Sequence, residues 1–333
     1  MSEGDMTTIW MDGKLRPWED GTIHVMSHGL HYGSGVFEGI KCYATERGPA
    51  IFRLDDHITR LLKSAEVYSI PVPYAKADLV QACLDLVSAN SQESCYIRPI
   101  IFYGYDTLGV APKRCPVHTA IATFNWGTYL GDDGLNNGVR ITISPWIKNH
   151  YASLPSTVKG CGHYTNSLLA VQEAKSRGFD EALLMNHEGN ISEGSGQNLF
   201  LVKDGTLLTN DASSSILMGI TRDSIIIMAA DMGIPVKITP MTRDMLLEAD
   251  EAFFTGTASE VTPIRELDGH AIGTGKPGEL TKSLRAAYFD IVTGKRPEYS
   301  KWLKLVPEPA TPGPNSAASR PALISTEGEK TGR

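Results

Sequence analysis

Residues 96–103 read YIRPIIFY, an apolar run rich in β-branched and aromatic residues, and residues 117–124 form a second run of this kind. Such runs predict buried strands. Before them, apolar residues recur at helical spacing over residues 54–65 and again over residues 79–87. Because strands and helices mix without the regular alternation of a doubly wound sheet, the sequence predicts an α+β fold.

The two halves of the chain are joined by residues 125–138, which are rich in Gly, Asn and Asp and are predicted to be an interdomain loop. Residues 1–124 are predicted to form a small N-terminal α/β domain that starts with a hairpin turned at Asp12-Gly13. Residues 139–306 are predicted to form the larger C-terminal domain, and residues 307–333 a disordered tail. The elements expected in the second half are strands at 139–144, 181–185, 198–203, 206–209 and 252–255 and helices at 164–176, from 220, and at 279–292.

Composition excludes several classes of protein. The chain of 333 residues has 41% hydrophobic and 21% charged residues, and its formal net charge is −7. An acidic balance without a basic stripe argues against nucleic acid as a partner. No uncharged apolar run approaches the ~18 residues of a membrane span. The five cysteines contain no C-x-x-C pair, and no signal peptide is visible, so we expect reduced thiols and a cytoplasmic location.

Three charged residues lie in surroundings where charge is costly. Lys159 is the only Lys, Arg, Asp or Glu between Lys148 and Glu173. A desolvated lysine has a lowered pKa and can form an imine, although a surface loop lysine is an equally good interpretation of the pattern. Arg98 lies inside the apolar run and needs a carboxylate from the protein or from a ligand. Glu193 is flanked by glycine-rich sequence, and from this pattern alone an ordinary turn residue is the favoured interpretation.

Two further segments are suited to binding a phosphate. Gly219-Ile220-Thr221 stands at a predicted helix start, where free N–H groups and the helix dipole favour an anion. Thr255-Gly256-Thr257-Ala258-Ser259 follows a predicted strand and offers hydroxyl groups around a glycine. A nucleophilic lysine, a lone carboxylate and two phosphate-binding turns in one domain point together to pyridoxal phosphate.

Other motifs are weaker. The glycines at 33, 35 and 39 have the wrong spacing for a dinucleotide-binding loop, and no βαβ unit surrounds them. His28 and His31 are three residues apart and could share a metal on a helix. The intervening glycine and the lack of a nearby carboxylate favour structural histidines, so we expect no metal.

The sequence resembles the branched-chain amino acid aminotransferases. These class IV, fold type IV pyridoxal-phosphate enzymes are grouped with D-amino acid aminotransferase and aminodeoxychorismate lyase. The resemblance extends from about Ile9 to about Thr293 and implies a two-domain fold, with a small α/β domain and a larger mixed β-barrel and α domain. It also implies a homodimer as the minimum assembly, with a hexamer as the alternative. The segments that carry it are residues 25–33, 36–40, 96–99, 191–194, 198–200, 219–222 and 256–258, with Lys159 and Tyr164.

The resemblance implies roles for the residues around pyridoxal 5'-phosphate. Lys159 would hold the cofactor covalently and, once released, move the proton between the substrate Cα and the cofactor. Glu193 would pair with the pyridine nitrogen, and Tyr164 would hydrogen-bond the ring's phenolic oxygen. Leu217 would pack on the ring face. The residues that would surround the phosphate are Arg60, Ile220, Thr221 and Thr257.

The resemblance also implies a substrate pocket. Burial of a Leu, Ile or Val side chain would contribute roughly 2 kcal/mol. Arg98 would bind the side-chain carboxylate of glutamate, so one pocket would serve aliphatic L-amino acids and their acidic co-substrate, with branched-chain 2-oxo acids and L-glutamate as products. The apolar residues implied are Tyr32, Phe37, Trp126 and Tyr129, with Leu108 and Val110 from a neighbouring subunit. The residues implied for the α-carboxylate are Tyr96, Gly256, Thr257 and Ala258.

Three alternatives remain open on the sequence. A D-amino acid or (R)-amine transaminase would keep Lys159 and Glu193 but should change the strand that carries Tyr96 and Arg98. A lyase related to aminodeoxychorismate lyase would need other pocket residues. A scaffold without catalytic activity on the same fold is the third, and it is disfavoured because each position needed to hold the cofactor is filled.

Overall fold

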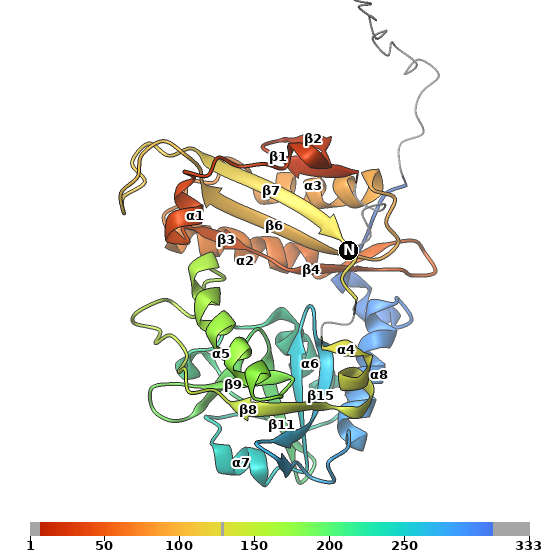
Figure 1. Ribbon diagram of the computed structural model, residues 1–333. Helices are drawn as coiled ribbons and strands as arrows, with labels where there is room; N and C mark the ends of the chain where they lie inside the picture. Colours follow the sequence, from red (N-terminus) through yellow and green to blue (C-terminus); the bar gives the residue numbers. More distant parts are fainter. Residues whose placement is uncertain (1–6, 128–129, 309–333) are drawn as a thin grey trace, which may run out of the picture.

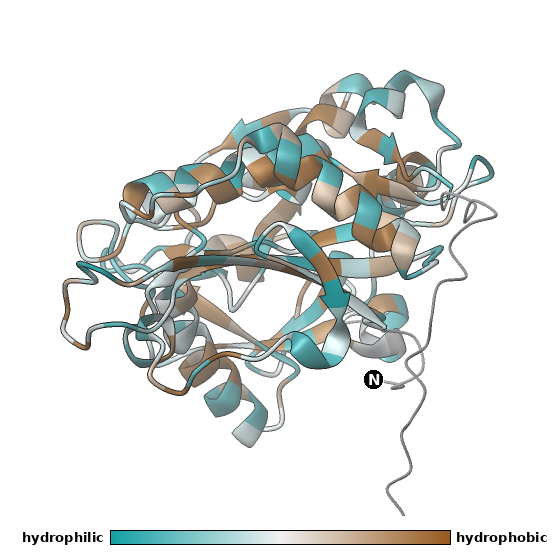
Figure 2. Ribbon diagram, turned by 90° about the horizontal axis from the view of Figure 1, so that it is seen from above, coloured by the Kyte–Doolittle hydropathy of each residue, from teal (hydrophilic) through white to brown (hydrophobic). Residues whose placement is uncertain are grey.

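The computed structural model describes residues 7–127 and 130–308, which form two halves stacked on one another (Figure 1). Each half is built on its own β-sheet, and helices from both halves cover the sheets. Helical ribbons alternate between hydrophilic and hydrophobic residues, as expected for helices that bury one face (Figure 2). Within the described ranges, no helix combines the length and apolar character that crossing a membrane requires.

The first sheet lies in the upper half of Figure 1, and its path among the described residues is β17-β5-β4-β6-β7-β1-β2, with β3 paired to β6. The pairs along it are antiparallel. Asp12 and Gly13 turn the first hairpin at φ 49° and 88°, the positive values that a tight two-residue turn requires. The strands are β1 (Thr8–Met11), β2 (Lys14–Pro17), β3 (Gly35–Phe37), β4 (Ile40–Tyr43), β5 (Ala50–Phe52), β6 (Cys95–Tyr103), β7 (Val117–Phe124) and β17 (Leu303–Leu305).

Helices α1 (His28–Tyr32), α2 (Leu54–Val67) and α3 (Lys76–Ala89) accompany this sheet. The apolar stripe of α2, including Ile58 and Leu61, is fully buried in one cluster with residues of α3, β4 and β6. Burying such side chains stabilises the half by about 1.5–3 kcal/mol each. This packing fixes the inner face of α2 beside the second half of the molecule, where the candidate site lies.

The second sheet is mixed, and its path among the described residues is β10-β9-β8-β15-β14-β11-β12-β13, with β16 paired to β15. β8 runs parallel to both β9 and β15, and β12 runs parallel to β13. The strands are β8 (Val139–Ile143), β9 (Glu181–Met185), β10 (Ile191–Gly194), β11 (Asn198–Lys203), β12 (Thr206–Thr209), β13 (Val236–Ile238), β14 (Glu251–Gly256), β15 (Glu260–Leu267) and β16 (His270–Ala271). The accompanying helices are α4 (Gly131–Asn137), α5 (Tyr164–Ser176), α6 (Ile220–Asp231), α7 (Arg243–Leu247) and α8 (Glu279–Val292).

Two sheets accompanied by helices, one sheet antiparallel and the other mixed, confirm the predicted α+β fold class. Many of the predicted helices and strands have the expected bounds. Two differences from the expectation concern the predicted domain limits, and elements such as β13 and β15 were not predicted. Residues 131–137, within the predicted interdomain loop, form α4. Residues 303–305, expected in the second domain, form β17 and pair with β5 of the first sheet. The predicted tail lies outside the described residues from residue 309 onward.

Candidate active site

A cavity that is open to solvent lies where the two halves meet, and residues of both halves line it. The segment that carries Lys159 closes one wall. The backbone N–H of Lys159 donates to Ser64 Oγ at 3.2 Å, and the carbonyl of Lys159 accepts from the N–H of Phe37 at 3.1 Å. Both partners belong to the first half, so this loop of the second half is fixed against it.

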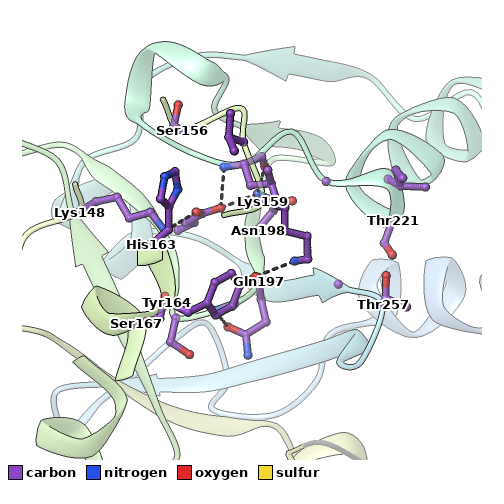
Figure 3. Close-up of a pocket in the computed structure, with 18 of the residues that line it drawn as sticks. Lys148, Ser156, Lys159, His163, Tyr164, Ser167, Gln197, Asn198, Thr221 and Thr257 are labelled. Carbon is purple, nitrogen blue, oxygen red and sulfur yellow. Dashed lines mark hydrogen bonds and ion pairs between the residues drawn. The ribbon is translucent and has the colours of Figure 1, made fainter. Parts of the chain in front are cut away.

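Lys159 and Tyr164 form the centre of the cavity (Figure 3). Lys159 Nζ donates a hydrogen bond to the hydroxyl of Tyr164 at 2.6 Å. Burial lowers the pKa of Lys159 to about 8, and the guanidinium groups of Arg60 and Arg98 act in the same direction against the opposing Glu38. Burial also raises the pKa of Tyr164 to about 12. A lysine with a lowered pKa and a neutral phenol beside it are suited to nucleophilic and proton-transfer chemistry.

Glu193 on β10 points into one end of the cavity. Lys148 Nζ lies 2.7 Å from its Oε1, while Asn198 Nδ2 and the N–H of Leu217 donate to its Oε2 at 3.0 and 3.2 Å. The carboxylate is buried, and these donors satisfy a charge that would otherwise be costly there. A carboxylate held in this way is an acceptor for a protonated ring nitrogen.

The opposite end of the cavity is suited to an anion. Figure 3 shows Thr221 and Thr257 there with their hydroxyl oxygens facing one another. Gly219 precedes α6 and provides no side-chain cap, so N–H groups of the first turn are open to a ligand. A Cβ at Gly219 would lie 2.0 Å from Asn198 Oδ1, so a larger residue here would displace the Asn198 amide that donates to Glu193. In the strand and turn that carry Thr257, the buried Thr255 Oγ1 and Ser259 Oγ lack hydrogen-bond partners among the described residues.

Arg60 approaches the cavity from α2 and is held by a buried carboxylate. Its Nε and Nη2 donate to Glu38 at 2.6 and 2.9 Å, and its Nη1 donates to the carbonyl of Met218 at 3.0 Å. Burial alone would raise the pKa of Glu38, but Arg60 and then His57 hold that pKa well below its usual range. The guanidinium is therefore fixed beside α6, where it adds positive charge.

A second cavity adjoins Lys159 and is lined by aromatic side chains. Arg98 lies between the rings of Phe37, Tyr96 and Trp126, at 5.0, 5.3 and 5.7 Å from their centroids. Its Nε is buried without a hydrogen-bond partner among the described residues. An arginine held by aromatic rings with an open donor can bind a carboxylate beside the aromatic surface of this pocket.

The structure brings most of the predicted site residues together. One cavity or the other is lined by Arg60, Lys159, Tyr164, Glu193, Leu217, Ile220, Thr221, Gly256 and Thr257, and by Phe37, Tyr96, Arg98, Trp126 and Ala258. Their individual roles remain predictions. Tyr32 and Val110 instead line a separate hollow, and Leu108 is exposed. Tyr129 lies outside the described residues.

Sequence reasoning gave no role to Glu38, Lys148 or Asn198, which position the predicted residues. Glu38 stands alone as a charge in the apolar run 36–40, and Lys148 ends the charge-free stretch before Lys159. Both isolated charges were signals of a buried partner. Asn198 is uncharged and gave no comparable signal in the sequence. Its amide donates to Glu193 and to the carbonyl of Leu217, and the fold alone brings these groups together.

Comparison with known proteins places this fold and site in a family. The sequence pattern of the family described as amino-transferase class IV matches residues 35–267, which is more than half of the chain. The chain therefore belongs to the class IV aminotransferases. This membership agrees with the lysine, carboxylate and anion-binding turns that line the cavity.

Individual relatives are similar over almost their whole length. The branched-chain-amino-acid aminotransferase of Pseudomonas aeruginosa is 45% identical over 298 residues, covering 90% of this chain and 97% of that protein. The enzyme of that name from Escherichia coli K12 is 43% identical over 299 residues, with coverage of 90% and 97%. A crystal structure of the E. coli branched-chain amino acid aminotransferase has a TM-score of 0.89 at 42% identity and covers 91% of this chain and 100% of its own. The T.th. enzyme of the same name, solved with pyridoxamine 5'-phosphate, has a TM-score of 0.88 at 44% identity, covering 91% and 99%.

Proposed function

We propose that this chain transfers the amino group of branched-chain L-amino acids (Leu, Ile, Val) to 2-oxoglutarate, giving branched-chain 2-oxo acids and L-glutamate by a ping-pong mechanism. The observation that carries the proposal is the position of Lys159. Its amine lies between an anion-binding cavity and an aromatic pocket that contains Arg98. The similar proteins named above are called branched-chain aminotransferases, which supports this choice of substrates.

The cavity fits pyridoxal 5'-phosphate by the chemistry of its donors. A phosphate would be held by Arg60, the first turn of α6 at Ile220 and Thr221, and the Thr257 turn with its unpartnered hydroxyls. Glu193 would accept from the ring nitrogen at the other end. The T.th. relative was solved with pyridoxamine 5'-phosphate and, separately, with N-(5'-phosphopyridoxyl)-L-glutamate. When bound, the cofactor supplies an aldehyde for the amino group and a ring that accommodates electrons from the substrate Cα.

The protein's own residues would bind the cofactor and move the proton. The Lys159 amine, with a pKa of about 8, is in part neutral near neutral pH and could take a proton from the substrate Cα and pass it to the aldehyde carbon of the cofactor. Tyr164, with its raised pKa, keeps its hydroxyl hydrogen and can donate it to an oxygen of the ring. Leu217 would pack on the ring face.

One pocket serves two kinds of side chain in this proposal. Phe37, Tyr96 and Trp126 offer apolar surface to Leu, Ile or Val. Arg98 among these rings offers a charged donor to the side-chain carboxylate of glutamate. When an aliphatic substrate is bound, the rings keep favourable contacts with the guanidinium, so its charge is not left wholly without a partner.

Replacing Arg98 with alanine tests the dual pocket. We expect kcat/KM for L-glutamate to fall about 30-fold or more, since losing a buried partner of a carboxylate costs at least about 2 kcal/mol. For L-leucine, kcat/KM should change much less, because no carboxylate enters the pocket. The measurement is single-turnover kinetics of each amino acid with the wild type and the variant. Equal losses for both substrates would reject the role of Arg98 in selecting glutamate.

Arg98→Lys is the matched control. It keeps the positive charge near Lys159 but loses the planar fork that binds a carboxylate with two hydrogen bonds. We expect glutamate turnover between those of the wild type and the alanine variant. If the two variants have equal kcat/KM for L-glutamate and also for L-leucine, the loss of activity comes from disturbed packing and not from carboxylate recognition.

The lowered pKa of Lys159 predicts a pH dependence in the cofactor-free protein. Since only the neutral amine reacts with an acylating reagent, modification of Lys159 should rise with pH to a midpoint of about 8. A free lysine derivative should give the ordinary midpoint of ~10.4. Peptide mass spectrometry after timed labelling across the pH range measures this. A midpoint for Lys159 that coincides with the free derivative would contradict its desolvated position.

The proposal includes a homodimer as the minimum assembly and a cytoplasmic location. Leu108 and Val110 are 47% and 85% exposed and lie outside both cavities, which is the arrangement expected if they complete a neighbouring subunit's pocket. All five cysteines are free thiols. Unpaired thiols agree with a reducing compartment.

A further inference from the structure

A buried hydrogen-bond network lies behind the anion-binding end of the cavity. We call it the Tyr43 network, and it consists of Lys41, Tyr43, Thr221, Glu260 and Tyr288. The hydroxyl of Tyr43 donates to Glu260 Oε1 at 2.9 Å and lies 3.3 Å from the hydroxyl of Tyr288. Lys41 Nζ lies 2.6 Å from the same Glu260 oxygen. Tyr43 and Tyr288 are 6% and 1% exposed, so water does not compete for these bonds.

One end of the network holds the turn that carries Thr257. Glu260 comes directly after Ser259 and opens β15, opposite Gly256 in the hairpin register. Its φ of 52° is in the left-handed region that favours glycine. A glutamate in this backbone conformation costs conformational free energy that glycine would avoid. We therefore expect its side chain to make contacts that offset this cost. The Glu260 carboxylate accepts hydrogen bonds from Lys41 and Tyr43, which lie on β4. These two bonds join the turn that carries Thr257 to the first sheet.

The other end of the network holds the start of α6. Tyr288 lies on α8, which packs against α6, and its phenol interacts electrostatically with the side chain of Thr221 in the first turn of α6. Tyr43 thus contacts partners of both anion-binding segments, although Thr221 and Thr257 lie far apart in sequence. Tyr43 lies on β4 of the first sheet and does not itself line the cavity.

We propose that Tyr43 is a positioning residue that holds the Thr221 and Thr257 segments at the spacing required for the phosphate of the cofactor. The proposal rests on the proposed function for the identity of the ligand. Glu260 and Tyr288 transmit the effect, because each is bonded to Tyr43 on one side and joined to an anion-binding segment on the other. A network whose members are all hydrogen-bonded is rigid, and a fixed spacing lowers the cost of ordering the site when the anion binds.

Tyr43→Phe removes the central hydroxyl and leaves the ring in place. The apparent Kd of the cofactor-free protein should rise about tenfold both for inorganic phosphate and for pyridoxal 5'-phosphate, as expected for loss of a hydrogen bond to a charged group. Calorimetric titration with each ligand measures this without any turnover. Affinities unchanged from the wild type would overturn the proposal.

Tyr299→Phe is the matched control. Tyr299 belongs to the same buried cluster as Tyr43, and its hydroxyl donates to Asp231 Oδ2 at 2.6 Å. Both variants lose one buried phenol that donates to a carboxylate, so both should lower the Tm. Only Tyr43→Phe should weaken phosphate binding. Equal weakening by the two variants would show general destabilisation and reject a positioning role.

Variants of Lys41 give a second test that does not depend on the folding of Tyr43→Phe. Lys41→Met should weaken phosphate binding in the same direction, and Lys41→Arg should restore it, because an arginine can keep the ion pair with Glu260. Failure of arginine to restore binding would count against the network. A wild type that binds phosphate but transfers no amino group would reject the proposed function, while the phosphate titrations would still decide the role of Tyr43.

Discussion

Lys159→Ala is expected to abolish transamination and to leave the protein unable to hold pyridoxal 5'-phosphate covalently. Lys159 is the amine that lies between the two cavities, and its Nζ contacts Tyr164 at 2.6 Å. Proton transfer by a positioned group contributes ~10²–10⁴-fold, so we expect kcat to fall by at least about a hundredfold. The yellow absorbance of the loaded enzyme, measured after gel filtration, should be lost together with the activity.

Two variants separate the chemistry of Lys159 from its charge and from general damage. Lys159→Arg keeps a positive charge in the cavity, but a guanidinium is neither a nucleophile nor a proton acceptor at ordinary pH, so it should be as inactive as Lys159→Ala. Lys282→Ala removes an exposed lysine of α8 that pairs only with Glu279 among the described residues, and it should behave as the wild type. Substantial turnover by either Lys159 variant would mean that another group moves the proton.

Local sequence patterns predicted most of the elements. Helices α5 and α8 and strands β7, β9, β11 and β12 have the predicted bounds, because apolar periodicity and turn residues determine such elements locally. The composition of residues 131–137 indicated a loop, yet they form α4 because distant contacts override weak propensity. Arg285 of α8 donates to the carbonyl of Leu135 at 2.8 Å, and α4 packs on β15.

The candidate site was predictable only in part. Lys159, Arg98 and Glu193 could be found because each is an isolated charge in sequence that otherwise lacks charge. The groups that hold the site together could not be found in this way. The pairing of Arg60 with Glu38 and of Lys148 with Glu193 depends on tertiary contacts between distant segments. The pairing of β17 with β5 was missed for the same reason, since its partner is about 250 residues away in the sequence.

The groups that line the pocket should distinguish L-amino acids from D-amino acids. The Thr257 turn and Tyr96 would bind the α-carboxylate, while Arg98, Phe37 and Trp126 would receive the side chain. With these groups fixed, only one enantiomer places its Cα proton near Lys159. A D-amino acid would have to exchange its carboxylate with its side chain, which leaves buried donors without partners, and such mismatches reduce kcat/KM by ~10³-fold or more.

The most direct test is a single-turnover panel on the wild-type enzyme loaded with pyridoxal 5'-phosphate. Loss of the lysine-attached cofactor absorbance is followed after mixing with L-leucine, L-valine, L-glutamate, D-alanine or an (R)-amine. We expect rapid conversion with the three L-amino acids and rates lower by about a thousandfold or more with D-alanine and the (R)-amine. Faster conversion with D-alanine or the (R)-amine than with L-leucine and L-glutamate would contradict the proposed function.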